Sequence, residues 1–322
     1  MTEPVARPDL EAVVRAAEGL RGIAVHTPLV AYRGDPDRGA NVWLKPEIHQ
    51  PVGSFKIRGV FHAVASLAPE ARAAGVSTVS AGNTAQALAW AARRFGVPAR
   101  SLMPDTAPRA KIDAVRALGA EAVLVPVAEL FRYLRERGWE SEPYAFIDPW
   151  TNRDVMAGHG SLGLEILADR PGVETVYIPV GGGGLLAGVA SALDEMAPWV
   201  RIVAVEPEGC PSLSAALAAG APVTVPCATI CDGVAVPYIT DEMFPLLSDL
   251  IDDAVLVSER AVRAAVKSLA LANKIVAEPS GALALAAALA TPAAERGDTV
   301  VLVTGGSIDR DLLVDILRDD SL

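Results

Sequence analysis

Short apolar runs alternate with helical patterns through most of this 322-residue chain, and this alternation restricts the fold more than any other feature. Strands are predicted at residues 76–80, 99–103, 122–126, 175–180, 201–205, 254–257 and 299–304. Helical patterns between them include 85–95, 107–118, 185–196 and 259–273, with Gly119 placed to end one helix and Ser258 to begin another. The strand–helix–strand order predicts an α/β protein with parallel sheets covered by helices on both faces.

Composition narrows the class of protein further. Hydrophobic residues make up 51% of the chain and aromatic residues 5%, so Ala, Val and Leu must supply most of a core large enough for two lobes. A net charge of −11 argues against a nucleic-acid partner. No apolar run reaches the roughly 18 residues of a membrane span, and the acidic, proline-bearing start does not resemble a signal peptide. We therefore expect a cytoplasmic protein with no membrane contact.

The cysteines predict neither a zinc site nor a disulfide framework. Cys210, Cys227 and Cys231 are odd in number and lack paired CxxC spacing. We expect all three to be reduced thiols.

Four consecutive glycines, Gly181–Gly184, follow the apolar run 175–180 and open a helical pattern at Leu185. Glycine backbone at a helix N-terminus can direct N–H groups at an anion, which predicts a phosphate cradle. A second interpretation is a dinucleotide fingerprint formed by the glycines at 182 and 184 and Ala187, with Glu206 about 20 residues on. We rank a single phosphate first, because the nucleotide interpretation leaves the loop around Lys56 without a role.

Lys56 stands in the loop Pro51–Gly59, after a Gly-Ser turn and Phe55. Burial there would lower the pKa of its amine, and a neutral lysine can form a Schiff base with a carbonyl such as that of pyridoxal phosphate (PLP). A second loop, Ser80–Gln86, joins a strand to a helix and could bind a small carboxylate, although Ser80 or Asn83 could equally cap that helix.

Several ordered motifs carry a family resemblance: SFKIRG at 54–59, SAGNTAQ at 80–86, GGGGL at 181–185, EPSGA at 278–282 and TGGS at 304–307. Through these motifs the chain resembles the fold-type II PLP enzymes over residues 25–310. Among these enzymes it resembles the serine/threonine dehydratases and serine racemases most. The resemblance implies the tryptophan synthase β-like fold, with two three-layer αβα lobes and parallel-rich sheets. It also implies a discontinuous large domain, 1–68 and 147–322, and a small domain, 69–146.

The resemblance also implies site residues. Lys56 would carry PLP and act as the base at the substrate Cα. The cofactor would also contact Phe55, Asn83, Gly181, Gly182, Gly183, Gly184, Leu185, Glu278 and Thr304. The substrate carboxylate would bind at Ser80, Asn83 and Thr84, and its side chain near Trp150 and Gly233. A neutral hydroxyl at Thr304, facing the pyridine nitrogen, would suit β-elimination better than transamination.

Some positions depart from the dehydratase pattern. Thr84 replaces a usual histidine, which keeps β-replacement open, and Ala81 replaces a serine that racemases need, which predicts negligible racemisation. Trp150 either limits the substrate side chain or packs between lobes. His159 is expected to be structural.

A divalent cation is possible but not predicted. Glu206 and Cys210 stand where relatives bind one, but the third position is Ser212, and one carboxylate is too few. The chain ends soon after TGGS, so no C-terminal regulatory domain is expected.

We therefore expect a PLP-dependent ammonia-lyase acting on a β-hydroxy-α-amino acid such as L-threonine or L-serine, as a homodimer. The alternatives are a β-replacement enzyme or a specialised hydroxy-amino-acid lyase, a nucleotide-dependent oxidoreductase, and a non-catalytic binding protein.

Overall fold

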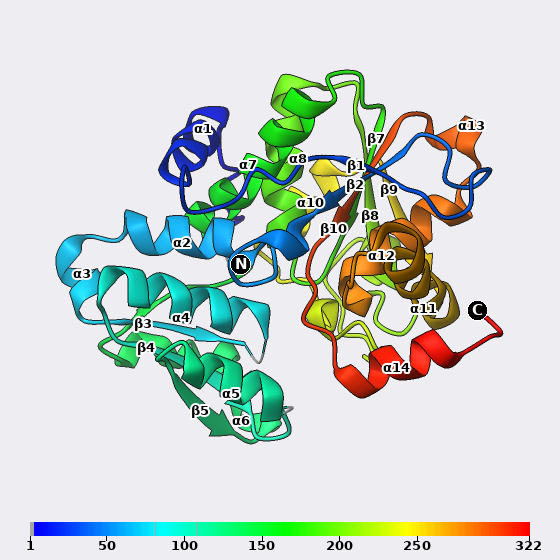
Figure 1. The fold of residues 1–322 in the computed structure, drawn as a ribbon. Helices are drawn as coiled ribbons and strands as arrows, with labels where there is room; N and C mark the ends of the chain where they lie inside the picture. Colours follow the sequence, from blue (N-terminus) through cyan, green and yellow to red (C-terminus); the bar gives the residue numbers. More distant parts are fainter. Residues whose placement is uncertain (1–2, 81, 108) are drawn as a thin grey trace.

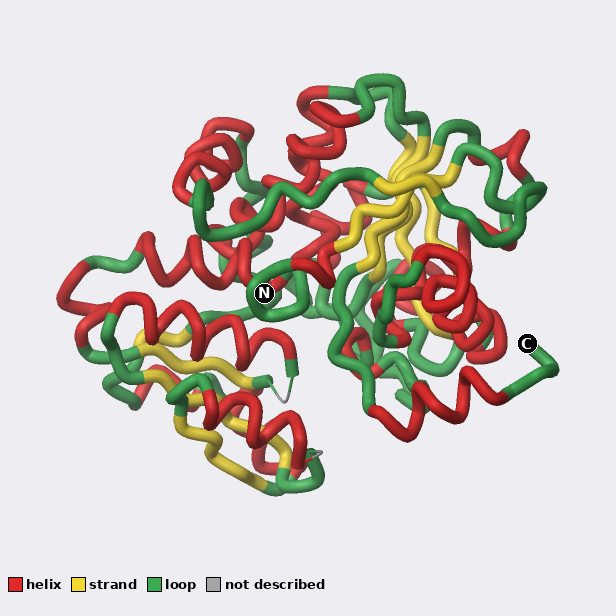
Figure 2. Tube along the Cα trace, viewed as in Figure 1, coloured by secondary structure: helices red, strands yellow, loops and turns green. Residues whose placement is uncertain are grey.

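The computed structural model describes residues 3–80, 82–107 and 109–322, and its strands form two sheets (Figures 1 and 2). The larger sheet has the order β1-β2-β10-β7-β8-β9, parallel except for the β1–β2 pair. The smaller sheet is parallel throughout, in the order β5-β4-β3-β6. Figure 1 shows them as two separate layered bodies, as the α/β expectation requires.

The strands are β1 (Val30–Ala31), β2 (Val42–Pro46), β3 (Val76–Val79), β4 (Ala99–Pro104), β5 (Glu121–Val125), β6 (Ala145–Phe146), β7 (Thr175–Pro179), β8 (Arg201–Pro207), β9 (Asp253–Val257) and β10 (Thr299–Val303). The helices are α1 (Leu10–Gly19), α2 (Lys56–Ser66), α3 (Pro69–Ala73), α4 (Asn83–Phe95), α5 (Arg109–Ala117), α6 (Val127–Arg135), α7 (Arg153–Asp169), α8 (Gly184–Met196), α9 (Ser212–Ala219), α10 (Phe244–Leu250), α11 (Glu259–Ser268), α12 (Pro279–Ala290), α13 (Ala293–Arg296) and α14 (Arg310–Arg318). Four short 3-10 or π turns complete them: η1 (Glu47–His49), η2 (Gly138–Ser141), η3 (Asp232–Val234) and η4 (Leu269–Asn273).

Both faces of the larger sheet are buried, and its strand residues alternate between two apolar cores. In β10, Val300 and Leu302 face the core formed with α7, α8 and α10, whereas Val301 and Val303 face the core formed with α11, α12 and α14. Strands buried on both faces read as continuous apolar runs, which is why the sequence predicted β7, β8 and β10.

The caps agree with the sequence prediction in detail. The Ser258 side chain accepts a hydrogen bond from the Ala261 N–H at the start of α11, and Gly119 has φ +92° after α5. The predicted helix 259–273 is too long, because its α-helical part ends at Ser268 and continues as the π turn η4.

An ion cluster fixes α2, the helix that starts at Lys56. The buried Arg58 guanidinium donates to Glu47 at 2.7 Å and to Glu165 of α7 at 2.7 Å, and Lys45 of β2 lies 2.6 Å from Glu165. The two carboxylates raise the pKa of Arg58 despite its burial, so this cation stays charged. The cluster thereby joins β2, α2 and α7 at the first turn of α2. The predicted loop Pro51–Gly59 is too long, because Lys56 is already the first residue of this helix.

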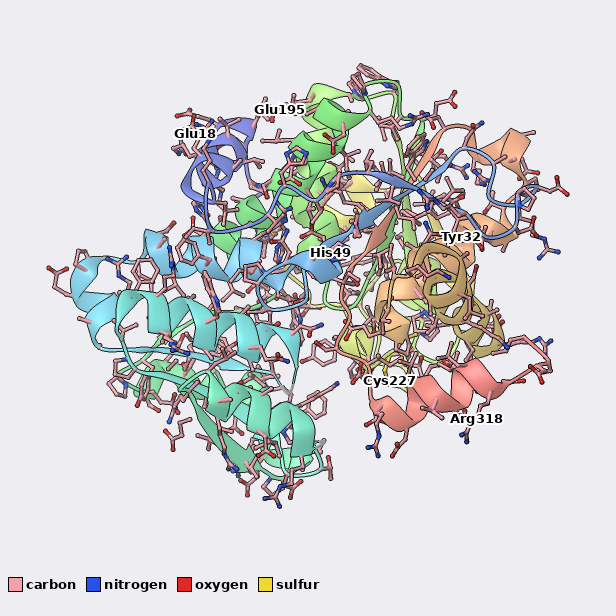
Figure 3. All side chains as sticks on the ribbon, in the orientation of Figure 1. Glu18, Tyr32, His49, Glu195, Cys227 and Arg318 are labelled. Carbon is pink, nitrogen blue, oxygen red and sulfur yellow. A yellow bond between two sulfur atoms is a disulfide. The ribbon has the colours of Figure 1, made fainter. Side chains whose placement is uncertain are left out.

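The prediction of three reduced cysteines is wrong for two of them. Cys210 and Cys227 are joined in a disulfide, with their Cα atoms 4.4 Å apart, and Cys231 is a buried free thiol. The loop between α9 and η3 returns the chain to Cys210 (Cys227 is labelled in Figure 3), a proximity that spacing along the sequence does not reveal. Within the described residues, no helix is long and apolar enough to cross a membrane.

Candidate active site

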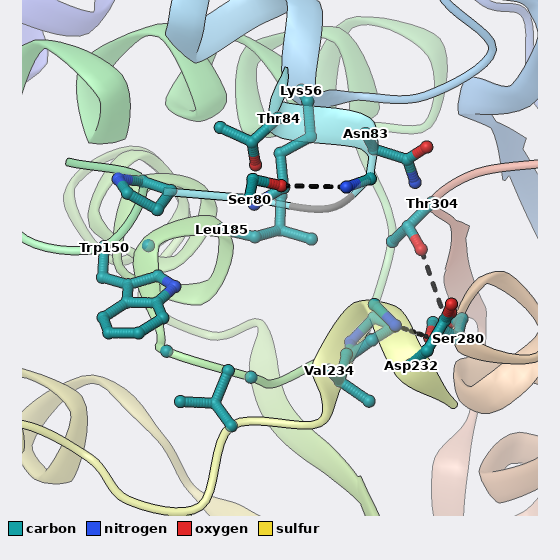
Figure 4. A pocket seen from close by; sticks show the side chains of 18 of the residues that line it. Lys56, Ser80, Asn83, Thr84, Trp150, Leu185, Asp232, Val234, Ser280 and Thr304 are labelled. Atoms are coloured by element: carbon teal, nitrogen blue, oxygen red, sulfur yellow. Dashed lines mark hydrogen bonds between the residues drawn. The ribbon is translucent and has the colours of Figure 1, made fainter. Parts of the chain in front are cut away.

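Lys56 lies in a pocket of about 390 Å³ that the carboxyl ends of both sheets border (Figure 4). Its loop is tied to the end of β10: the Phe55 N–H donates to the Thr304 carbonyl at 3.0 Å, and Ser54 forms a β-bridge with Gly305. The Phe55 ring lies 4.8 Å from the Lys56 amine. These contacts fix the backbone on the amino side of Lys56 and direct its side chain into the pocket.

Burial lowers the pKa of Lys56 from 10.5 to about 8, although the nearby carboxylates of Glu278 and Asp148 oppose the shift. A substantial fraction of the amine is then neutral near physiological pH. Such an amine is a competent nucleophile and base.

The glycine loop lines the same pocket as Lys56 and leads from β7 into α8. A Cβ at Gly182 would lie 2.3 Å from the Trp150 indole, one at Gly184 would lie 2.6 Å from the Pro149 carbonyl, and Gly183 has φ +93°. Side chains are therefore excluded from this turn, and the N-terminus of a 13-residue helix opens at it. A cradle of this kind suits a phosphate.

Asn83 begins α4, and its amide donates to the Glu278 carboxylate at 2.7 Å, while its Oδ1 is buried without a partner in the described residues. Glu278 is 3% exposed, and burial, together with Asp232, raises its pKa to about 7. The Ser80 hydroxyl accepts from the Gly82 N–H at 3.1 Å, and Thr84 is buried in the same wall.

The remaining predicted residues also line this pocket. Thr304 follows β10, and its hydroxyl donates to the Ser280 carbonyl at 3.4 Å. The Gly233 N–H donates to the Ser280 hydroxyl at 2.9 Å. Trp150 lies along the glycine loop, so the structure places it in the pocket wall (Figure 4).

Comparison with known proteins places this geometry in a family. Residues 21–306 match the family model described as pyridoxal-phosphate dependent enzyme. The chain is a pyridoxal-phosphate dependent enzyme. It is 38% identical over 315 residues to the L-threonine ammonia-lyase of Thermotoga maritima, covering 96% of this chain and 78% of that protein.

Other relatives agree at the level of the family. The biosynthetic L-threonine dehydratase of Escherichia coli is 41% identical over 86% of this chain, but the match covers only 54% of that longer protein. The solved processed form of threonine deaminase isoform 2 from Solanum lycopersicum has a TM-score of 0.89 at 32% identity, over 100% of this chain and 99% of that one. Maize serine racemase has a TM-score of 0.88 at 31% identity, over 96% and 97%.

The pocket residues fit PLP, the cofactor of this family. The lysine has a lowered pKa, the glycine turn leaves room for a phosphate, and the unpartnered Asn83 Oδ1 shows that the pocket has unused hydrogen-bonding capacity. The match to the PLP family also decides against the dinucleotide interpretation. Glu206, its expected ribose ligand, does not line the pocket and instead accepts from the N–H groups of Leu213 and Ser214 at the start of α9.

Glu206 and Cys210, the two positions where relatives bind a cation, have other partners. The Glu206 carboxylate accepts from the N-terminus of α9, and Cys210 is bonded to Cys227. His159 packs behind Phe55, with ring centroids 4.7 Å apart, and is not among the residues that line the pocket. Ala81, on which the racemisation argument rests, lies outside the described residues.

Sequence reasoning missed three residues of the pocket wall. Ser280 holds both Thr304 and Gly233, and Lys111 of α5 contacts the Asp232 carboxylate across the pocket. Ser280 stands inside the EPSGA motif at 278–282, and Asp232 is the polar residue next to Gly233, which the sequence places near the substrate; these positions are the only signal of the two residues in the sequence.

Proposed function

We propose that this enzyme is an ammonia-lyase that converts a β-hydroxy-α-amino acid, such as L-threonine or L-serine, to a 2-keto acid and ammonia. This function is supported above all by the position of Lys56, a partly neutral amine between a glycine phosphate cradle and the Ser80–Thr84 loop. The similarity to proteins named L-threonine ammonia-lyase and L-threonine dehydratase supports the same reaction.

PLP would be held from several sides. Lys56 would bond to its aldehyde carbon, the N–H groups of Gly181–Gly184 and Leu185 would bind its phosphate, and Phe55 would pack beside its ring. Asn83 would donate to the ring oxygen, oriented by Glu278, and the Thr304 hydroxyl would face the ring nitrogen. When bound, PLP withdraws electrons from the substrate Cα and so weakens its bond to hydrogen.

The chain's own residues would then carry out the proton chemistry. Ser80, Asn83 and Thr84 would hold the substrate carboxylate at the N-terminus of α4, which favours an anion. The Lys56 amine would remove the Cα proton, and the β-hydroxyl would leave with a proton as water. Hydrolysis then uses one water and releases ammonia, so each substrate yields one keto acid and one ammonia.

A β-replacement reaction is the second candidate, because Thr84 stands where dehydratases usually have histidine. The neutral hydroxyl at Thr304 and the Ala81 substitution support elimination with negligible racemisation.

The decisive experiment measures 2-oxobutyrate and ammonia from L-threonine, and pyruvate and ammonia from L-serine, with and without added sulfide. We expect keto acid and ammonia in equal amounts and no sulfur-containing product. A product that forms only when sulfide is present would instead establish β-replacement.

Lys56→Ala should lower turnover by at least about 10³-fold, since it removes the general base. Lys267→Ala, on α11 outside the pocket, is the matched control and should keep full activity. Borohydride treatment of the wild-type enzyme should attach the cofactor to Lys56, and a peptide map that places the label on another lysine would refute the assignment.

We also propose that residues 69–146 form a small domain inserted into a large one, 1–68 and 147–322, and that the enzyme is a cytoplasmic homodimer. The confinement of the smaller sheet to residues 76–146 supports the domain boundaries. Sedimentation analysis and cell fractionation would test the other two statements.

A further inference from the structure

A second cavity, of about 260 Å³, adjoins the pocket of Lys56. The two cavities share part of their walls, including Ser80, Pro149, Trp150 and Val236. The far wall of the second cavity is α6, which belongs to no part of the Lys56 pocket. We call this second cavity the side chamber.

The side chamber has an apolar wall. Of the residues that line it, only Ser80, Thr106 and Asp148 carry hydroxyl or carboxylate groups. Asp148 Oδ1 already accepts from the N–H groups of Trp150 and Thr151, at 2.7 and 3.1 Å, and the Ser80 hydroxyl accepts from Gly82. Asp148 Oδ1 is therefore occupied by its own turn, and the Ser80 hydroxyl keeps its proton for the substrate carboxylate.

The helix α6 presents an apolar stripe to the chamber. Val127, Leu130, Phe131 and Leu134 follow the i, i+3, i+4, i+7 spacing of one helical face, and all four line the chamber. None of them belongs to an apolar core cluster of the described residues. Such a face normally packs against other apolar groups, so it is available here to a ligand.

The size of the chamber exceeds what threonine needs. An apolar cavity of about 150 Å³ is enough to hold a benzene molecule. The β-methyl group of threonine would leave most of 260 Å³ unfilled. Because Ser80 lines both cavities, an amino acid held by its carboxylate at the Ser80–Thr84 loop can extend its side chain past Trp150 into the chamber.

We infer that the substrate of this enzyme is a β-hydroxy-α-amino acid whose β-carbon carries a large apolar group, branched or aromatic. The inference rests on the proposed function, because it uses the same lysine and carboxylate site. It adds that the side chamber selects the substrate.

The test compares L-threo-3-phenylserine with L-threonine as substrates of the holoenzyme. Phenylserine should give phenylpyruvate and ammonia with a kcat/KM at least about 10-fold higher, a difference within the range that apolar pockets achieve. Leu134→Trp fills the chamber and should lower kcat/KM for phenylserine about 10-fold or more while leaving that for L-threonine within about twofold.

Two further variants control for effects on folding. Arg132→Trp introduces the same side chain at an exposed position of the same helix and should change neither substrate. Phe131→Ala adds no bulk but removes the contact between this ring and the substrate side chain, so it should lower kcat/KM for phenylserine and not for L-threonine. If L-threonine is the better substrate, or if Leu134→Trp and Phe131→Ala lower both substrates equally, the inference is overturned.

Binding separates this inference from the proposed function. L-phenylalanine, which has no β-hydroxyl to lose, should bind the holoenzyme at least about 10-fold more tightly than L-alanine by calorimetry, and Leu134→Trp should abolish the difference. If no hydroxy amino acid is turned over but this difference holds, the proposed function fails and the chamber stands. If L-phenylalanine and L-alanine bind equally, or if L-lysine binds more tightly than L-phenylalanine, the chamber does not select apolar side chains, whatever the turnover.

Discussion

Glu278 allows a quantitative test of the electrostatics of the pocket. Its carboxyl is 3% exposed and its pKa is raised from 4.5 to about 7, first by burial and then by Asp232. A carboxyl whose pKa is higher in the folded state costs stability at any pH where the unfolded state has lost its proton, because the folded state must either keep the proton or bury the charge. The cost is therefore absent below pH 4.5, grows as the pH rises from 4.5 to 7, and is complete above 7.

The magnitude follows from the shift. Each pKa unit corresponds to about 1.4 kcal/mol, so the ionised carboxylate costs about 3 kcal/mol at pH 8 and under about 1 kcal/mol at pH 5. Glu278→Gln removes the charge and keeps an oxygen that can accept from Asn83. The cofactor-free variant should therefore exceed the cofactor-free wild type in free energy of unfolding by about 3 kcal/mol at pH 8, and by little at pH 5.

Urea unfolding of both proteins at half-unit steps between pH 5 and 8.5 measures this difference. Asp232→Asn is the control for the cause, since it removes the charge that adds to burial. When both proteins also carry Asp232→Asn, the difference in free energy of unfolding at pH 8 should be smaller but still present, because burial is the larger cause of the raised Glu278 pKa. A gap that is constant across this range, or larger in acid, would refute the reasoning.

Three further substitutions test other parts of the structure. Gly182→Ala should weaken cofactor binding, measured by equilibrium dialysis, because its Cβ would lie 2.3 Å from the Trp150 indole, whereas Gly172→Ala, with open space around it, should not. Arg58→Met should lower the free energy of unfolding by about 3–5 kcal/mol in urea melts, since it leaves a buried carboxylate unpaired; a loss below about 1 kcal/mol would contradict the ion cluster. Cys210→Ser should cost about 3 kcal/mol under oxidising conditions, given the 17-residue separation, and nothing when the wild type is compared in reductant.

The sequence predicted seven strands of the two sheets to within about two residues but missed β1, β2 and β6. Strands such as β7 and β10 are apolar after their first residue, whereas β2 carries Lys45 as the fourth of its five residues. That lysine is buried because it pairs with Glu165 from α7, more than a hundred residues on, and hydropathy along the chain contains no trace of such a partner. The disulfide between residues 210 and 227 was missed for the same reason, since pairing depends on where a loop returns in space.

The pocket was easier to predict than its polar wall. Lys56 and the glycine loop are recognisable in the sequence because packing alone does not explain a lysine or four consecutive glycines at these positions. Ser280 and Lys111 are ordinary residue types whose importance comes from distances to Gly233 and Asp232. Local sequence cannot supply those distances.

The end of β10 explains how distant segments assemble into one site. Gly305 bridges to Ser54, the residue two before Lys56, and its carbonyl accepts from the Glu278 N–H at 3.0 Å. A Cβ at Gly305 would lie 2.4 Å from the Glu278 carboxylate and 3.0 Å from the Asn83 amide. The first glycine of TGGS thus lets the lysine loop, the carboxylate and the asparagine approach a single strand end. A side chain there would push apart Glu278 and Asn83, whose hydrogen bond lies in the wall of the Lys56 pocket, so this glycine is required by the chemistry of the pocket as much as by the turn.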